Sequence, residues 1–393
     1  MPNLQAKIFN AGGIVSALLL LTIPFSTSIS IIFSGILLLL WLASFQFKKL
    51  PWLLRNNQVA LFSLLLFIGL FIATSYSSAP FKDAIKMWAK YREFFLFIVL
   101  LPFLSTPQHK KWMIYAFITG MIATLLVSYA MYFDFIPRPR YAATLKSIIT
   151  QSIMISFFGY YCALQIRNPE IIKNKIFWCL LLLICIHNLY FVAIGRTGQL
   201  LGLLFVFLYC FQHLNTKLSM LLISLFAVFF ALFINYSEMG FRITEGFQNV
   251  LNYDFNAPET ETSMGRRLTF WKYSLTLIKE SPWFGHGTGS FETEYQRLAD
   301  SSFYITKNPH SEFLSLGVQL GIPGLLLFLG FLFSQFQLAQ KMEIPRKWFA
   351  QGLFLSITVS SIFNSPILDH TEGHWFGCLL ALCFAPQSTQ KNA

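Results

Sequence analysis

The stretch IFWCLLLLICIHNLYFVAIGRTGQLLGLLFVFLYCFQ, residues 176–212, sets two apolar runs on either side of the short turn AIGRTG. A helix needs roughly 20 apolar residues to cross about 30 Å of hydrocarbon, and each run approaches that length. The stretch therefore predicts two transmembrane helices, at 176–194 and 199–212, joined by a tight turn at a membrane surface.

Apolar runs of this kind recur along the whole chain of 393 residues. Hydrophobic residues make up 55% of the sequence and charged residues 12%, whereas soluble domains carry about 25% charged residues. This composition excludes a soluble globular protein and predicts one all-α polytopic membrane domain over 1–393. Ten further spans bring the expected total to about twelve: 8–25, 28–46, 58–76, 93–106, 112–133, 148–166, 218–236, 310–338, 349–365 and 373–386. The first two could form a hairpin or one broken span, and we expect no removable signal peptide.

The positions of Lys and Arg predict the orientation, because short cytoplasmic loops retain these residues. If both termini are cytoplasmic, the inside loops collect many basic residues and only two acids, Glu170 and Glu343. We therefore expect a bacterial inner-membrane protein with both termini in the cytoplasm. Its one long polar loop, 237–309 between spans nine and ten, would lie in the periplasm and is the first place to look for function.

The outside loops are also basic, which the orientation rule does not predict. The guanidinium group of arginine can donate two parallel hydrogen bonds to a phosphate or pyrophosphate group. Attraction to lipid headgroups is the simpler alternative. Arg196 stands out because an arginine at membrane depth is costly unless it is paired or solvated; the alternative is a snorkelling side chain at a helix end. The candidate anion-binding residues are Lys86, Lys90, Arg92, Arg138, Arg140, Arg196, Arg266 and Arg267.

A helix is expected inside the long loop, because residues 268–279 have apolar positions at helical spacing and stop near Pro282. Arg267 and Trp271 are four residues apart and share a face of this helix. The arginine would hold a phosphate, and the indole would pack on a sugar ring or at the bilayer interface. A purely interfacial amphipathic helix is the alternative. The turn GHGTG at 285–289 resembles a phosphate cradle only weakly.

His310 is the strongest candidate for a catalytic group. The preceding Asn308-Pro309 is a typical helix start, so the histidine is expected in the first turn of the span at 310–338. The helix dipole would then lower the pKa of His310 and keep the ring neutral. A neutral histidine at a membrane surface can act as a general base.

Three glycines, Gly317, Gly321 and Gly324, fall on one stripe of the same span, where they would let a neighbouring helix pack closely. Pro323 predicts a kink, because it removes the backbone hydrogen bond to the Gln319 carbonyl.

The loop between the last two spans, PILDHTEGH at 366–374, holds two acids and two histidines within six residues. We expect it on the outside face, opposite His310. Asp369 is the first candidate there for orienting His310 or binding acceptor hydroxyls, with a solvated turn as the alternative. The spacing is not diagnostic of a metal site, and the six cysteines lie inside predicted spans.

These residues carry a resemblance to a known family. His310-Ser311, nine residues, Gly321, two residues and Gly324 resemble the His-[Asn/Ser/Gln]-x9-Gly-x-x-Gly motif of O-antigen ligases. The segment GRRLTFW at 265–271, followed by Pro282, Gly285 and Gly287, resembles the outside loop of the O-antigen ligase and polymerase superfamily.

The resemblance implies a metal-independent membrane glycosyltransferase that needs no cofactor. Its donor would be a glycan on undecaprenyl pyrophosphate and its acceptor lipid A-core or another glycan. Family members use one arginine after the seventh span, which is 176–194 in this chain, and one in the long loop. By position these are Arg196 and Arg267, with Arg266 as a competing choice for the second.

Two other functions stay open. A polysaccharide polymerase would use the same donor site with a different acceptor, and a protein acceptor is a further option. A polysaccharide or lipid transporter belongs to another class, but transporters often carry internal repeats and polar residues near the bilayer midplane, which this sequence does not display. We expect no nucleic-acid partner.

Overall fold

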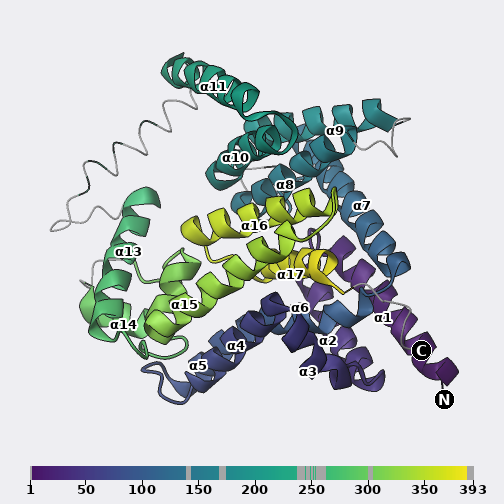
Figure 1. The fold of residues 1–393 in the computed structure, drawn as a ribbon. Coiled ribbons are helices and arrows are strands. Elements are labelled where there is room, and N and C mark those ends of the chain that lie inside the picture. The colour runs from purple at the N-terminus through teal and green to yellow at the C-terminus, as the bar shows by residue number, and fades with distance from the viewer. Residues whose placement is uncertain are drawn as a thin grey trace.

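The computed structural model describes residues 2–138, 143–167, 174–236, 263–299 and 304–386, with the single residues 244, 248, 251 and 253. Throughout these residues the regular elements are helices (Figure 1). In chain order they are α1 (Pro2–Thr22), α2 (Thr27–Ala43), η1 (Gln46–Lys49), α3 (Leu50–Asn56), α4 (Gln58–Ile72), α5 (Phe81–Lys90), α6 (Glu93–Phe103), α7 (Pro107–Tyr132), α8 (Ile148–Ile166), α9 (Lys175–His187), η3 (Asn188–Val192), α10 (Arg196–His213), α11 (Thr216–Tyr236), α13 (Ser263–Glu280), α14 (Phe291–Leu298), α15 (Glu312–Gln340), α16 (Arg346–Phe363) and α17 (His370–Phe384).

The expected all-helical fold is confirmed, and every predicted span coincides with a helix or, for 176–194, with α9 and the π-helical turn η3. The first two predicted spans are separate helices, α1 and α2, packed against each other. Four helical segments in the described part of the chain are long and apolar enough to cross a membrane: Leu4–Thr22, Pro107–Tyr132, Lys175–Val192 and Glu312–Gln340. Twelve membrane crossings and a periplasmic loop stay predictions.

Two short helices, α6 and α17, occupy the centre of the bundle. The side chains of α17 are buried from Thr371 to Phe384, and nearly all of α6 is buried as well. They pack on each other, and aromatic rings such as Trp375 and Phe157 interlock around them. Because other helices cover them, α6 and α17 need not match the thickness of a bilayer.

The first turns of α6, α8, α10, α15 and α17 meet at one end of the bundle, which we call the polar end. Thr150 at the start of α8 donates to Glu372 in the first turn of α17, with 2.8 Å between the oxygens. The Glu312 amide at the start of α15 donates to the Asn364 carbonyl at 3.0 Å, just before α17. Several positive helix ends therefore point into one region.

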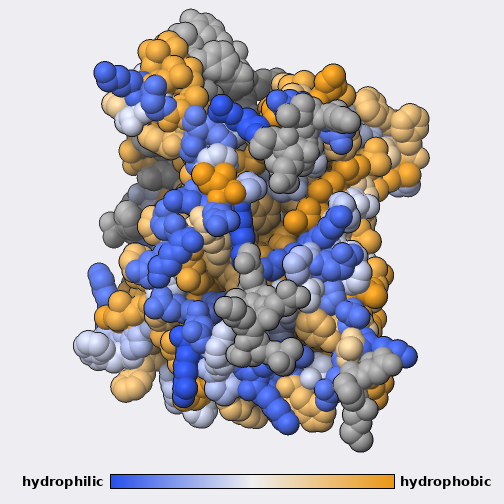
Figure 2. Space-filling model, turned by 45° about the vertical axis from the view of Figure 1, so that its right-hand side comes forward, coloured by the Kyte–Doolittle hydropathy of each residue, from blue (hydrophilic) through white to orange (hydrophobic). Residues whose placement is uncertain are grey.

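The opposite end carries both ends of the chain (Figure 1). At the start of α7, the His109 ring contacts the Asn10 side chain at 3.2 Å, and Lys110 donates to the Ala385 carbonyl at 3.1 Å. With the right-hand side of Figure 1 turned forward, hydrophilic residues gather across the middle of the surface and hydrophobic residues lie at its margins (Figure 2). This separation of polar from apolar surface suits a membrane protein.

Helix α15 is broken at Gly321, whose backbone is non-helical with φ 67° and ψ −157°. Pro323 has no amide hydrogen, and the Gln319 carbonyl that it leaves free accepts instead from the Gly287 amide at 3.1 Å. Beside it, the Ile322 amide donates to the Pro282 carbonyl at 2.7 Å. The kink predicted at Pro323 is therefore a docking point for the turn that follows α13.

That turn is the glycine-rich stretch 285–289. Gly285, Gly287 and Gly289 all have positive φ values, 64°, 87° and 80°. The successive amides of residues 286 to 289 donate to Val318, Gln319, Ala73 and the Gln319 side chain, at 2.8 to 3.1 Å. Because these amides are engaged by the protein, the turn packs α15 against α4 and does not form a phosphate cradle.

The glycine stripe of α15 receives a neighbouring helix, as expected, at one of its three positions. A Cβ at Gly317 would lie 2.6 Å from the Ile278 side chain of α13, so this glycine lets α13 pack closely. A Cβ at Gly321 would overlap the Pro282 carbonyl oxygen, so this glycine admits the turn that follows α13. Gly324 faces its own helix at Leu320.

We predict that Gly321→Ala destabilises the protein by about 2 kcal/mol or more, because an alanine is strained at this φ and its methyl group would overlap the Pro282 oxygen. Thermal unfolding in detergent measures the effect. Gly35→Ala is the matched control, since a Cβ there would meet no atom within 4 Å. Equal melting temperatures for the two variants would contradict the prediction.

Candidate active site

His310 lies just before α15, in a left-handed backbone conformation with φ 55°. The expectation that it sits in the first helical turn is wrong, since the helix begins at Glu312 with Ser311 as N-cap. The Glu312 amide bonds to the Asn364 carbonyl of the neighbouring loop, so no helical ladder extends back to residue 308. Asn308 instead accepts the His310 amide at 2.8 Å in a local turn. Left-handed non-glycine residues cost free energy and gather at functional sites.

The His310 ring is partly enclosed. It stacks on Phe270 of α13 with 6.0 Å between the ring centroids, and its buried Nδ1 has no hydrogen-bond partner among the described residues. Burial lowers the pKa of His310, and the nearby Arg267 charge lowers it further, while the Asn364 side chain acts in the opposite direction. The ring is therefore neutral near pH 7, through burial and Arg267 rather than through the predicted helix dipole.

The charge of Arg196 acts on Arg267, and the charge of Arg267 acts on His310. Arg196 is the first residue of α10, and Arg267 is a partly buried residue of α13. Burial lowers the pKa of Arg267, and the charge of Arg196 contributes to the shift. Within the described ranges neither arginine forms a salt bridge. Two cations held together without an acid favour an anionic ligand between them.

Close packing puts Arg196 in this place. Cβ atoms at Gly195 and Gly198 would overlap the Ser152 side chain of α8, so only glycines allow α10 to begin so close to α8. The Ser156 hydroxyl also donates to the Gly198 carbonyl at 2.5 Å. The tight turn predicted around Arg196 thus fixes the arginine backbone on a rigid helix start.

A polar chain leads away from His310 on its other side. The Asn364 amide, which lies beside the His310 ring, contacts both Glu372 carboxylate oxygens at 3.3 Å. Thr150 donates to the same carboxylate. Glu372 is buried, and these donors satisfy the oxygens of its carboxyl group. The chain holds Asn364 in one orientation against His310.

Asp369 caps the start of α17 and, unlike Glu372, has no hydrogen bond to Asn364 among the described residues. Its Oδ1 accepts the amides of Thr371 and Glu372 at 2.9 and 3.0 Å, so it is the N-cap of α17. The Asp369 side chain is exposed, and its charge offsets part of the burial that lowers the pKa of Lys146. Of the two acids in this loop, Glu372 is the one linked through Asn364 to His310.

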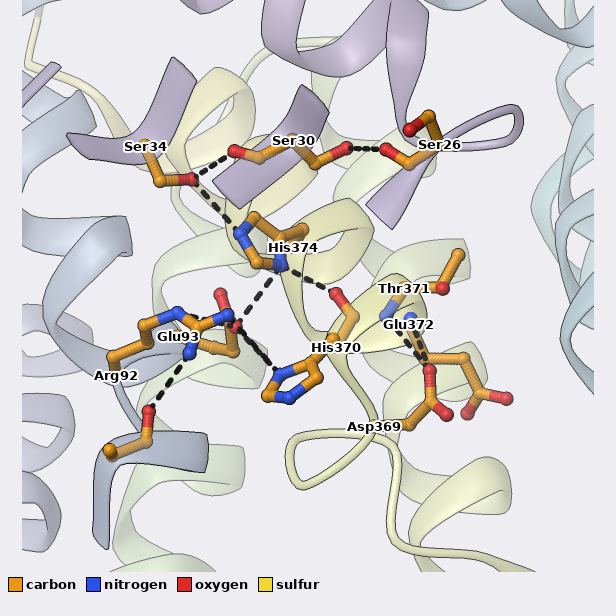
Figure 3. A network of polar contacts seen from close by, with 11 residues as sticks. Ser26, Ser30, Ser34, Arg92, Glu93, Asp369, His370, Thr371, Glu372 and His374 are labelled. Atoms are coloured by element: carbon orange, nitrogen blue, oxygen red, sulfur yellow. Dashed lines mark hydrogen bonds and ion pairs between the residues drawn. The ribbon is translucent and has the colours of Figure 1, made fainter. Parts of the chain in front are cut away.

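Arg92 is turned towards the first turn of α17 (Figure 3). Its guanidinium donates to the Ala89 carbonyl at 3.2 Å, lies 3.3 Å from Nδ1 of His370 and 3.6 Å from the Glu93 carboxylate. The side chain is one-third exposed. Arg92 thus joins the polar end through α17, on the side away from Asn364.

The two residues next to Arg267 have separate contacts. Arg266 lies over the Tyr304 ring at 5.3 Å from the centroid, whereas Arg267 faces Arg196 and His310. Trp271 packs near Phe363 of α16, with 6.4 Å between the ring centroids. Arg267 is therefore the arginine of the pair that the fold brings to His310.

The remaining predicted cations lie outside this cluster. Lys86 is exposed and pairs with Asp83 at 3.6 Å, and Lys90 ends the same helix, α5. Arg138 donates to two carbonyls at the end of α7 and acts as a cap there. Arg140 lies outside the described residues.

Sequence reasoning missed Glu93 and Glu312, two buried acids at the first residues of α6 and α15. One oxygen of Glu312 accepts the Ile367 amide at 3.0 Å, which ties the start of α15 to the loop before α17. An ionisable residue inside an apolar span is a functional signal in itself. Both acids fall within predicted spans, so that signal was present in the sequence.

Several apolar helices identify a multi-pass membrane protein, in which arginine side chains act on a neutral histidine. Residues 176–329, which include Arg196, Arg267 and His310, match the family model described as "O-Antigen ligase". The match confirms the predicted resemblance to the O-antigen ligase family, whose members are membrane glycosyltransferase-like enzymes. The chain is also 24% identical over 362 residues to a Haemophilus influenzae protein described as "Uncharacterized protein", covering 86% of this chain and 88% of that protein.

We predict that Arg267→Gln raises the pKa of His310, because it removes a cation that disfavours the imidazolium. Side-chain NMR of labelled histidines measures the pKa, and His310→Gln identifies the signal. Lys279→Gln, a charge loss at an exposed position of the same helix, is the control. An unchanged pKa in Arg267→Gln would mean that burial alone keeps the ring neutral.

Proposed function

We propose that this protein transfers a glycan from undecaprenyl pyrophosphate to lipid A-core at the periplasmic face of the bacterial inner membrane. In this arrangement both termini are cytoplasmic and the polar end faces the periplasm. The family match supports the general class of enzyme. The donor, the acceptor and the residue roles are our proposal, and a polymerase with a growing glycan as acceptor would use the same donor chemistry.

One observation carries the proposal: Arg267 lies within electrostatic reach of both the neutral His310 and Arg196, an arginine from a distant segment of the chain. A pyrophosphate has the charge and the oxygen geometry that arginine forks bind. As the bond between the anomeric carbon and the phosphate oxygen breaks, its electron pair and negative charge pass to the pyrophosphate. Arginines already fixed in a partly buried site stabilise that charge without reorganising.

His310 has the properties of the general base for this reaction. The acceptor hydroxyl oxygen forms the new bond to the anomeric carbon, and its proton passes to the neutral imidazole. The Asn364–Glu372 chain supports the resulting imidazolium, and the proton then returns to solvent. The phosphoester linkage supplies the free energy, so no nucleotide is needed at this step.

We predict that His310→Ala lowers glycan transfer by about 100-fold or more, the usual contribution of a general base. Transfer is measured with purified protein in vesicles that contain a lipid-pyrophosphate-linked oligosaccharide and the acceptor. The control is His213→Ala, which removes a histidine from the opposite end of α10. Transfer by His310→Ala at more than a tenth of the wild-type rate would refute the base assignment.

We also predict that Arg196→Lys is nearly as damaging as Arg196→Ala, because a point charge does not reproduce two parallel hydrogen bonds to a phosphate. The comparison uses the KM for the donor together with kcat. Arg138→Lys is the control, since that arginine caps α7 through backbone carbonyls. Near-normal transfer by Arg196→Lys would instead indicate simple charge attraction.

A further inference from the structure

The buried acid Glu93 lies against the first turn of α17, beside His374 and His370 (Figure 3). Only 2% of its surface is exposed, and neither carboxylate oxygen has a hydrogen bond among the described residues. Its Oε1 lies 3.1 Å from Nδ1 of His374, 3.6 Å from Nε of Arg92 and 3.9 Å from Nδ1 of His370. A carboxylate in this position requires a counter-charge.

Helix α17 packs directly on this acid. A Cβ at Gly373 would lie 2.6 Å from Cγ of Glu93, so the glycine is what lets the two helices come together. Glu93 is also the first residue of α6, where the helix dipole favours a negative charge. The packing places the carboxylate against the first turn of α17, next to His374.

The contacts of His374 require a proton on Nδ1. Its Nδ1 faces the His370 carbonyl oxygen at 2.5 Å as well as the Glu93 carboxylate. Its Nε2 lies 2.9 Å from the Ser34 hydroxyl, which itself donates to the Ser30 carbonyl at 2.8 Å. Nδ1 therefore donates, because a carbonyl oxygen only accepts. Nε2 donates to the Ser34 hydroxyl when the ring is an imidazolium and accepts the hydroxyl proton when the ring is neutral.

Arg92 and His370 complete the cluster at its exposed edge. Arg92 donates from Nη2 to Nδ1 of His370, so the His370 ring is neutral at that nitrogen. The titratable base nearest to Glu93 is therefore His374, and Arg92 is a permanent cation at a longer distance. Breaking such a buried pair would leave an uncompensated charge between α6 and α17.

We propose that Glu93 and His374 form a buried ion pair that positions the first turn of α17 for catalysis. The same turn carries Glu372, which holds Asn364 against His310 on the opposite side of the helix. Glu93 and His374 touch neither donor nor acceptor, so they are positioning residues. The inference rests on the proposed glycan transfer, in which His310 is the base.

The test compares Glu93→Gln, His374→Gln and the double variant in the vesicle transfer assay. Each single variant is expected to lower kcat about tenfold, because one buried charge loses its partner. The KM for the donor should stay within about twofold of wild type, since Arg196 and Arg267 are unchanged. The double variant should be about fivefold faster than His374→Gln, because no unpaired charge remains. Glu292→Gln, on a partly exposed acid paired with Lys307, is the control.

Three outcomes would overturn the inference. Wild-type kcat in Glu93→Gln would mean that the acid is already neutral, because glutamine resembles a protonated carboxyl. Additive losses in the double variant would mean that the two residues do not act as a pair. If the two substitutions changed the melting temperature non-additively but left kcat unchanged, the pair would stabilise the fold without positioning the site.

The inference can fail separately from the proposed function. If His310→Ala stops transfer while Glu93→Gln does not, the glycan transfer stands and the positioning role is wrong. If wild-type protein shows no transfer, the proposed function fails. The ion pair itself is then tested by the same double-variant comparison of melting temperatures, where lack of coupling would refute it.

Discussion

The polar end depends on one electrostatic constraint: the first turns of α6, α8, α10, α15 and α17 point their positive ends into one buried region. Three buried acids, Glu93, Glu312 and Glu372, lie in the first turns of α6, α15 and α17. Each acid contacts a neighbouring element, so these carboxyl groups hold the helix starts together.

Arg196 and Arg267 have no acidic partner among the described residues. The charge of Arg196 acts on Arg267 and that of Arg267 on His310, while the buried acids contact other partners. The positive charges of Arg196 and Arg267 therefore have no acidic partner in the described part of the chain, whereas Arg92 on the other side of α17 lies 3.6 Å from the Glu93 carboxylate. A ligand with a diphosphate would complete the balance on the side of His310, which explains in physical terms why a transferase for lipid-pyrophosphate donors would need this fold.

Close backbone packing fixes the helices that carry the site residues. The break in α15 at Gly321 and the glycine turn at 285–289 dock α13 onto α15, and Phe270 of α13 packs on His310. Gly195 and Gly198 fix the start of α10 against α8 in the same way. Arg267 lies on a helix outside the bundle, yet these contacts bring it to Arg196, 71 positions earlier in the chain. Positioning by packed helices is what preorganises charged side chains for catalysis.

The sequence by itself determined the apolar helices, the family resemblance and the three residues that meet at the site, because hydropathy and the spacing around His310 are local patterns. Only the tertiary structure decided that His310 precedes α15, since the Glu312 amide bonds to Asn364 from another loop. It also decided which arginine acts on His310, and that the helix packed on Gly317 of α15 is α13. The pairing of Glu93 with His374 joins residues 281 positions apart, and no local pattern encodes a contact made only when α6 and α17 pack.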